Sequence, residues 1–161
     1  MSIAENVAIV RDQMAEAAVK AGREPGEILL CAATKMNGAD NVRQAVAAGV
    51  DACGENRVQE LLEKLPQGAY TGAPVHFIGH LQKNKARQVV GAVDLIESVD
   101  SPELLALIGR LARERGIRQD ILLEVNIGGE EAKSGAAPEA LAELAAAAAA
   151  DPGVRLRGLM A

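Results

Sequence analysis

The sequence predicts an α/β fold of the (β/α)8 TIM-barrel type, with about six of the eight strands present in this chain. Short apolar runs alternate with helical patterns along all 161 residues, which specifies a parallel sheet with helical crossovers. The runs are rich in Val, Ile and Leu without clean polar alternation, as expected where both faces of a sheet are covered. Polar residues stand where the strands end, on the face where barrel enzymes place their chemistry: Lys35, Asn56, His80, Asp100 and Asn126.

The strands are predicted from short apolar runs bounded by turn residues. In chain order these runs are 29–35, 50–55, 75–80, 93–99, 121–127 and 155–161. Each is short enough for a strand, and the first five are followed by a polar or glycine-containing stretch. The runs therefore predict six strands joined by short connections.

The helices are predicted between the strands, over 3–22, 40–48, 56–65, 81–91, 101–116 and 138–150. The first has apolar residues at helical spacing from Ile3 to Ala18. Glycine or proline ends the others, as Gly49 and Pro66 do for the second and third. Ser101-Pro102 gives the fifth helix a cap followed by proline at its first position.

A doubly wound open sheet is the competing architecture, because it uses the same alternation of elements. The glycine-rich turn that usually follows its first strand is replaced here by Thr34-Lys35-Met36-Asn37. Six strands do not close an eight-stranded barrel, which takes about 250 residues. We therefore expect one incomplete domain over residues 1–161, from a truncated protein or a fragment, unless a partner chain supplies the remaining strands. Its open sheet edges could also self-associate.

Composition excludes several classes of protein. The chain has a net charge of −5, one Tyr, one Phe and no Trp, so it lacks the basic patch and stacking aromatics of a nucleic-acid surface. Its first residues do not resemble a secretory signal, and no apolar run approaches the roughly 20 residues that span a bilayer. We expect a cytoplasmic protein that binds neither nucleic acid nor membrane.

The two cysteines, Cys31 and Cys53, lie in apolar strand-like runs. We expect them to be small buried residues of a reducing compartment and not a disulfide. A metal site that combines them with His76 and His80 is the minor alternative, because no pair has the close spacing of structural zinc ligands. No metal is therefore predicted.

Lys35 ends the first apolar run and is the main candidate for chemistry. An amine at the mouth of an α/β fold can be desolvated, which makes it neutral and nucleophilic. It could then form a Schiff base with an aldehyde such as pyridoxal phosphate. Position alone favours a solvated charge at the end of a strand. Motifs later in the chain change that balance.

Two further strand ends offer polar side chains. Asn56 either hydrogen-bonds near a cofactor ring or caps the helix that follows it. His76 and His80, four residues apart on one predicted strand, share a face. We expect His80 to reach the mouth and His76 to be a core histidine with a satisfied ring. A general acid or base role for either is the minor alternative.

Two charged segments resemble anion sites without meeting their requirements. Residues 128–135 lack the Gly-Lys-Ser order of a P-loop and carry two acidic residues, which favours a βα loop with Lys133 and Ser134 near the mouth. Lys83, Lys85 and Arg87 make a small basic cluster at the start of a helix. A solvated surface is the expected outcome there, with a weak anion site as the alternative.

Six motifs, in order, resemble the YggS/PROSC family of pyridoxal 5'-phosphate homeostasis proteins. They are Ala33-Thr-Lys35, Gly54-Glu-Asn-Arg-Val-Gln-Glu60, His76-Phe-Ile-Gly-His-Leu-Gln-Lys-Asn-Lys85, Ser98-Val-Asp100, Val125-Asn-Ile-Gly-Gly-Glu-Glu-Ala-Lys-Ser-Gly135 and Arg157-Gly-Leu-Met-Ala161. The third is long enough to be nearly diagnostic. The resemblance spans residues from about 28 to 161.

The resemblance implies a barrel like the N-terminal domain of alanine racemase, with the cofactor aldehyde on Lys35. It places Met160 in the barrel wall, where packing is the default and cofactor contact is the alternative. Asn37 stands where the family usually has a second lysine. Family members also continue beyond Arg-Gly-Leu-Met-Ala with the strands that grip the cofactor phosphate. On this comparison we expect the chain to be truncated at its C-terminus, without the phosphate-gripping segments.

Three functions follow from the resemblance. The first is a pyridoxal phosphate carrier in cofactor homeostasis, which holds the cofactor as a Schiff base on Lys35 and has no catalytic residues of its own. The second is a racemase-like enzyme, which would need a second acid or base and a group that tunes the pyridine nitrogen. The third is a truncated form that has lost cofactor binding. The predicted cofactor-binding residues are Lys35, Asn56, His80 and Met160.

Overall fold

A computed structural model describes residues 1–130 and 134–161. The chain divides into two compact units, Met1–Val75 and His76–Ala161. Its strands are parallel where their register is defined, and they follow one another in the sheet in the order β1-β2-β3-β4-β5-β6. This is the topology expected when each strand is followed by a helical crossover.

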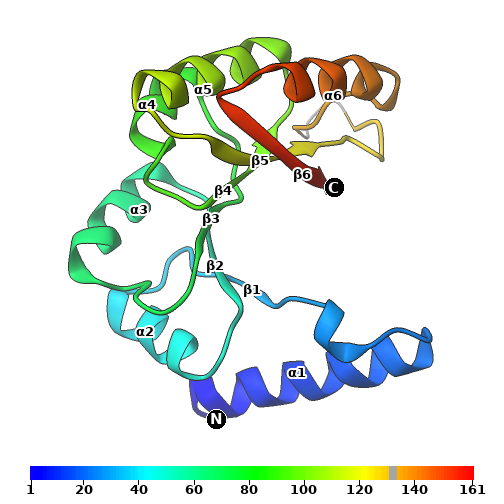
Figure 1. Ribbon diagram of the computed structural model, residues 1–161. Helices are drawn as coiled ribbons and strands as arrows, with labels where there is room; N and C mark the ends of the chain where they lie inside the picture. Colours follow the sequence, from blue (N-terminus) through cyan, green and yellow to red (C-terminus); the bar gives the residue numbers. More distant parts are fainter. Residues whose placement is uncertain (131–133) are drawn as a thin grey trace. The chain divides into compact units, whose positions relative to one another are not determined.

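The first unit contains two strands and three helices (Figure 1). In chain order they are α1 (Ile3–Lys20), β1 (Cys31–Ala33), α2 (Ala39–Ala47), β2 (Ala52–Glu55) and α3 (Val58–Lys64). Short 3-10 turns lie at Pro25–Glu27 and Leu65–Gln67. Strands β1 and β2 pair in register, with Ala33 opposite Gly54 at their carboxyl ends. Residues that follow these two positions therefore leave the sheet at the same edge.

Local sequence explains how α1 begins and how it is tied to the strands. Ser2 and Glu5 form a capping box, in which the Ser2 Oγ accepts from the Glu5 amide at 3.2 Å and the Glu5 carboxylate accepts from the Ser2 amide at 2.6 Å. Asp51, just before β2, accepts from the Leu30 amide at 2.6 Å and pairs with Arg11 of α1 at 2.8 Å. One carboxylate thus joins the helix to the start of both strands.

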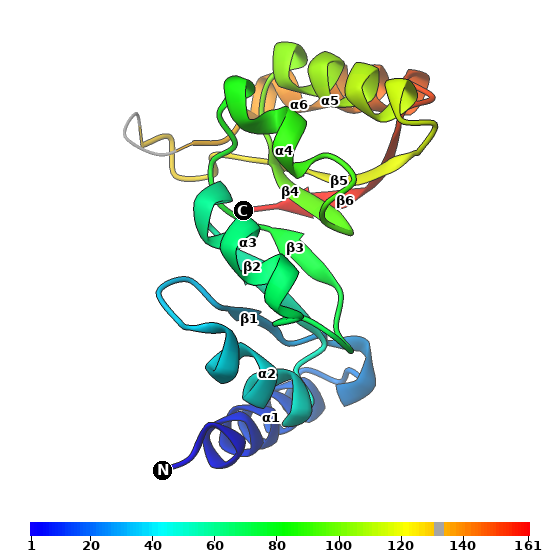
Figure 2. The same ribbon diagram turned by 90° about the vertical axis from the view of Figure 1, so that its left-hand side faces the viewer.

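The second unit contains most of the sheet. Its strands are β3 (Val75–Phe77), which begins on the last residue of the first unit, β4 (Leu95–Val99), β5 (Gln119–Glu124) and β6 (Val154–Met160). Its helices are α4 (Ala86–Val89), α5 (Pro102–Glu114) and α6 (Leu141–Ala150), with 3-10 turns at Lys83–Lys85 and Pro138–Ala140. Figures 1 and 2 both show α5 and α6 side by side over the strands of this unit.

The core of the second unit lies between the strands and α5. Phe77, Ile96, Ile108 and Ile121 are almost completely buried. The amphipathic α5 buries its apolar side against the sheet and begins at the predicted Ser101 cap, whose hydroxyl accepts from the Leu104 amide at 3.3 Å. This packing holds the carboxyl ends of β4 and β5 in place.

The predicted order and type of the strands and α-helices are confirmed, whereas the 3-10 turns were not predicted. The strands are shorter than the apolar runs: β1 is Cys31–Ala33, and β3 ends at Phe77, which leaves His80 outside it. Coverage of both sheet faces was also predicted, yet β5 alternates buried and half-buried residues, and Leu159 of β6 is 57% exposed. Burial of Cys31 was wrong, because this thiol lies on the exposed face of β1, whereas Cys53 is buried.

No helix in the described parts of the chain combines the length and the apolar character needed to cross a membrane.

Candidate functional site

Lys35 lies in an exposed turn directly after β1. Asn56 follows β2 in the same way, and both residues come two positions after the paired residues Ala33 and Gly54. The two side chains therefore leave the same edge of the first unit, at the carboxyl ends of its strands. The sequence suggested a desolvated amine, but the Lys35 side chain is exposed. Its amine is therefore accessible to an incoming aldehyde.

Asn56 does not cap the following helix, which corrects one of its two predicted roles. The N-cap of α3 is Arg57, and no side chain makes a capping hydrogen bond there. The Oδ1 atom of Asn56 is buried and has no hydrogen-bond partner among the described residues. A buried acceptor without a donor is unfavourable, so this atom is suited to accept from a bound ligand.

Asn37 stands where the family that the sequence resembles usually has a second lysine. Its side-chain amide donates to the backbone carbonyl of Lys35 at 3.1 Å, and its own backbone amide donates to the carbonyl of Thr34 at 3.2 Å. The residue therefore closes the turn around Lys35 and adds no positive charge beside the amine.

A buried polar network lies beneath this turn, and sequence reasoning did not identify it. Glu55, at the end of β2, is fully buried. Its Oε1 accepts from the Thr34 hydroxyl at 2.6 Å, from the Lys64 amine at 2.7 Å and from the Tyr70 hydroxyl at 2.9 Å. Burial and the Glu55 carboxylate raise the pKa of Tyr70, so its hydroxyl stays protonated and donates.

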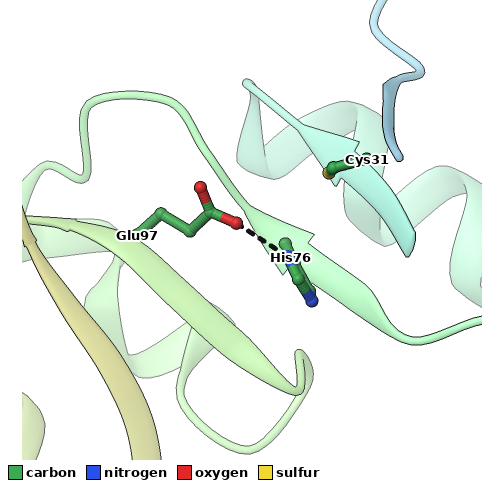
Figure 3. Close-up of side chains that lie close together, drawn as sticks. All are labelled: Cys31, His76 and Glu97. Atoms are coloured by element: carbon green, nitrogen blue, oxygen red, sulfur yellow. Dashed lines mark hydrogen bonds and ion pairs between the residues drawn. The ribbon is translucent and has the colours of Figure 1, made fainter. Parts of the chain in front are cut away.

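The second unit has its own polar groups, within its strands and beyond their ends. His76 of β3 and Glu97 of β4 point toward one another, with 2.7 Å between the ring Nδ1 and the carboxylate Oε1 (Figure 3). The expected satisfied ring of His76 is confirmed, although the ring is half-buried. His80 lies beyond the end of β3 and is exposed. Cys31, also drawn in Figure 3, is the exposed thiol of β1 in the first unit.

Glu124 is the last residue of β5 in the second unit, and Asp100 is the nearby acidic residue. The Oε1 of Glu124 accepts from the Ser134 hydroxyl at 3.1 Å, while its buried Oε2 has no partner in the described part of the chain. Burial raises the pKa of the Glu124 carboxyl above its ordinary value, and the negative charge of Asp100 adds to this. The Ser134 hydrogen bond and His80 oppose the rise.

A cavity of about 520 Å³ opens beside Glu124. It is lined by Glu124, Val125, Asn126, Ile127, Gly128, Glu130, Ser134 and Ala161. Ser98, at the end of β4, also has a buried hydroxyl without a partner among the residues the structure describes. These orphaned groups indicate that the strand ends of the second unit are built for more hydrogen bonds than they make alone.

We expect the Glu124 carboxyl to titrate above the usual range for glutamate, about 4.3. Asp100→Asn should lower this pKa because it removes a nearby negative charge, and Ser134→Ala should raise it further because the hydroxyl favours the charged form. Carbon-detected NMR of the side-chain carboxyl measures both shifts. Asp120→Asn, at the other end of β5, is the control and should change neither.

The raised pKa of Glu124 makes the free energy of unfolding depend on pH. The folded chain binds this proton more tightly than the unfolded chain does. The stabilisation from Glu124 is therefore present below the unfolded pKa and is lost as the pH rises through the folded one. A Glu124 pKa in the ordinary range, or a fall on Ser134→Ala, would contradict the described geometry.

The other residues that the sequence analysis named lie in the second unit. Met160 lies in β6 and is half-buried, and its carbonyl accepts from the Val125 amide at 2.8 Å. Ser134 lies beside Glu124, but Lys133 is outside the described residues. The basic cluster of Lys83, Lys85 and Arg87 is exposed, as the solvated-surface interpretation expects, and its Arg87 pairs with Glu114 of α5 at 3.2 Å.

Comparison with known proteins identifies the family. The family model for the N-terminal domain of alanine racemase matches residues 2–161. A Pseudomonas aeruginosa pyridoxal phosphate homeostasis protein is 43% identical over 163 residues, which cover 99% of this chain and 70% of that protein. The protein of the same name from Escherichia coli K12 is 41% identical over 165 residues, or 99% of this chain and 69% of its own length.

This chain belongs to the pyridoxal phosphate homeostasis protein family. It spans about 70% of the length of these relatives. The structure of PipY from Synechococcus elongatus with PLP bound is 35% identical, with a TM-score of 0.83, and the match covers 99% of this chain and 69% of PipY. The predicted family and the predicted racemase-like fold class are therefore confirmed.

Proposed function

We propose that this chain is a cytoplasmic pyridoxal phosphate carrier that holds the cofactor on Lys35 and has no dedicated reaction of its own. The observation that carries the proposal is the exposed lysine at the carboxyl end of β1, in a member of a family whose PipY structure contains PLP. Pyridoxal phosphate supplies an aldehyde, with which a lysine amine condenses to a Schiff base and water.

The residues of the first unit fit such a ligand. The Lys35 amine is accessible, and the buried Oδ1 of Asn56 at the same sheet edge lacks a donor among the described residues. The neighbouring Glu55, Lys64 and Tyr70 bond to one another or to the backbone and leave the amine of Lys35 as the accessible nucleophile of this turn. We propose Lys35 and Asn56 as cofactor contacts, and His80 and Met160 stay predicted contacts.

A carrier needs an attachment point but no acid–base pair. Lys64 and Glu60 beside Lys35 are engaged in holding the backbone of its turn, which supports binding over turnover. An assay of amino-acid racemisation with added cofactor is accordingly expected to show no rate above that of free pyridoxal phosphate.

The test is covalent trapping. The chain is incubated with pyridoxal phosphate, reduced with borohydride and weighed intact, and we expect a gain of one cofactor together with a visible absorption band before reduction. Lys35→Ala should lose both signals, because the amine that bonds the aldehyde is gone. Lys20→Ala removes an exposed lysine from α1 of the same unit and should keep both.

Two results would count against the proposal. Equal labelling of Lys35→Ala and the unaltered chain would place the cofactor on another amine. No labelling of the unaltered chain would favour a form that has lost cofactor binding.

A further inference from the structure

The backbone on both sides of Lys35 is held by charged side chains from β2 and α3. Thr34, before the lysine, is bonded through its carbonyl to the Lys64 amine at 2.8 Å and through its hydroxyl to Glu55 at 2.6 Å. Met36, after the lysine, donates its amide to the Glu60 carboxylate at 2.7 Å. The backbone of the turn is therefore anchored while the lysine side chain stays exposed.

Lys64 joins these two anchors. Its amine also lies 2.7 Å from Glu55 and 3.2 Å from Glu60, and its side chain is only 7% exposed. Burying a charged group is costly, and apolar packing of similar volume often stabilises a fold as well or better. An apolar side chain could not donate to the Thr34 carbonyl, so the buried amine has a use that packing alone would not provide.

Met36 shows what the anchoring maintains. Its φ of 61° lies in the left-handed region, which is unfavourable for a residue with a Cβ. The Glu60 carboxylate accepts the amide of this residue, and that hydrogen bond is the main reason the pKa of Glu60 is lowered. A carboxylate on α3 thus favours the unusual backbone conformation beside the lysine.

We infer that Glu60, with Lys64 and Glu55 behind it, is a positioning residue that fixes the Lys35 turn for attachment of the cofactor. This inference rests on the proposed function. Glu60 acts through the backbone of Met36, and it holds the origin of the Lys35 side chain so that the amine meets the aldehyde in one orientation.

The first experiment compares cofactor affinity in matched variants. Glu60→Ala should weaken binding of pyridoxal phosphate at least about tenfold, because it frees the Met36 amide. Glu60→Gln keeps an acceptor oxygen and should restore most of the affinity. Glu63→Ala, an exposed position on the same helix with the same change of charge, should bind as the unaltered chain does.

Stability separates positioning from a purely structural role. Tyr70→Phe removes a hydrogen bond to Glu55 but none to the turn, so it should lower the melting temperature and leave the affinity unchanged. Glu60→Ala should weaken binding of pyridoxal phosphate beyond any effect on the melting temperature, because it removes the acceptor of the Met36 amide. An affinity loss that simply follows the melting temperature across these variants would overturn the inference.

A third measurement needs no cofactor. In the free chain, hydrogen exchange at the Met36 amide should be faster in Glu60→Ala than in Glu63→Ala, because only the first change removes its acceptor. If the unaltered chain gains no adduct, the proposed function fails and this inference fails with it. If it gains an adduct and Glu60→Ala binds as tightly as Glu63→Ala, only the positioning role is wrong.

Discussion

Replacing Gly153 with alanine is expected to destabilise the chain by about 3 kcal/mol or more. A Cβ at this position would lie 2.8 Å from the carbonyl carbon and 2.9 Å from the Cα of Gly109 in α5. Both are backbone atoms, so the clash is relieved only if α5 moves away from the start of β6. Because Gly153 also accepts from the Gln119 amide at 2.9 Å, such a movement disturbs β5 as well.

Urea denaturation followed by circular dichroism measures this loss, and hydrogen exchange should locate it in the second unit. Gly26→Ala is the matched control, because no atom lies within 4 Å of its added Cβ and its φ is not positive. That variant should be unchanged or more stable by up to about 1 kcal/mol. Equal stability of the two variants would show that α5 and β6 do not approach as closely as described.

Lys64→Met is expected to cost about 3–5 kcal/mol, because it leaves the fully buried Glu55 carboxylate without its countercharge. The same denaturation experiment measures the loss. Adding Glu55→Gln to Lys64→Met should recover a large part of it, since the double variant buries no charge at this position. A double variant less stable than Lys64→Met alone would show that Glu55 is stabilised by groups other than the lysine.

The order of the elements could be predicted from the sequence because each apolar run and each helical pattern is a local signal. The ends of the strands could not, because pairing between strands sets them. β1 is only Cys31–Ala33, as the register with β2 ends at Gly54. His80 was predicted to lie on a strand because the apolar run continues past Phe77. The strand itself ends at Phe77.

The site could be predicted in part. Lys35 and Asn56 were found from their positions at the ends of two predicted strands, and the structure places both at one sheet edge. Their roles toward a cofactor stay predictions. The network of Glu55, Lys64 and Tyr70 was missed, because it depends on how α3 packs against the strands. A lysine on the buried side of a helix beside Leu61 is the one sequence signal that could have indicated it.

The close approach of Gly109 and Gly153 was beyond sequence reasoning for a related reason. Gly153 follows the predicted last helix, 138–150, where the sequence indicates only that glycine or proline ends the helix. The sequence does not distinguish a glycine that ends a helix from a glycine that allows a neighbouring backbone to approach closely. Only the packing of α5 against β6 distinguishes the two uses.

The different surroundings of the two cysteines give the chain a natural labelling handle. Burial raises the pKa of the Cys53 thiol to about 11, so this sulfur remains protonated and shielded from maleimide reagents at neutral pH. Cys31 is exposed on β1, four positions before Lys35. A fluorophore can therefore be attached at Cys31 without engineering, where its emission would report the arrival of a light-absorbing ligand on the neighbouring lysine.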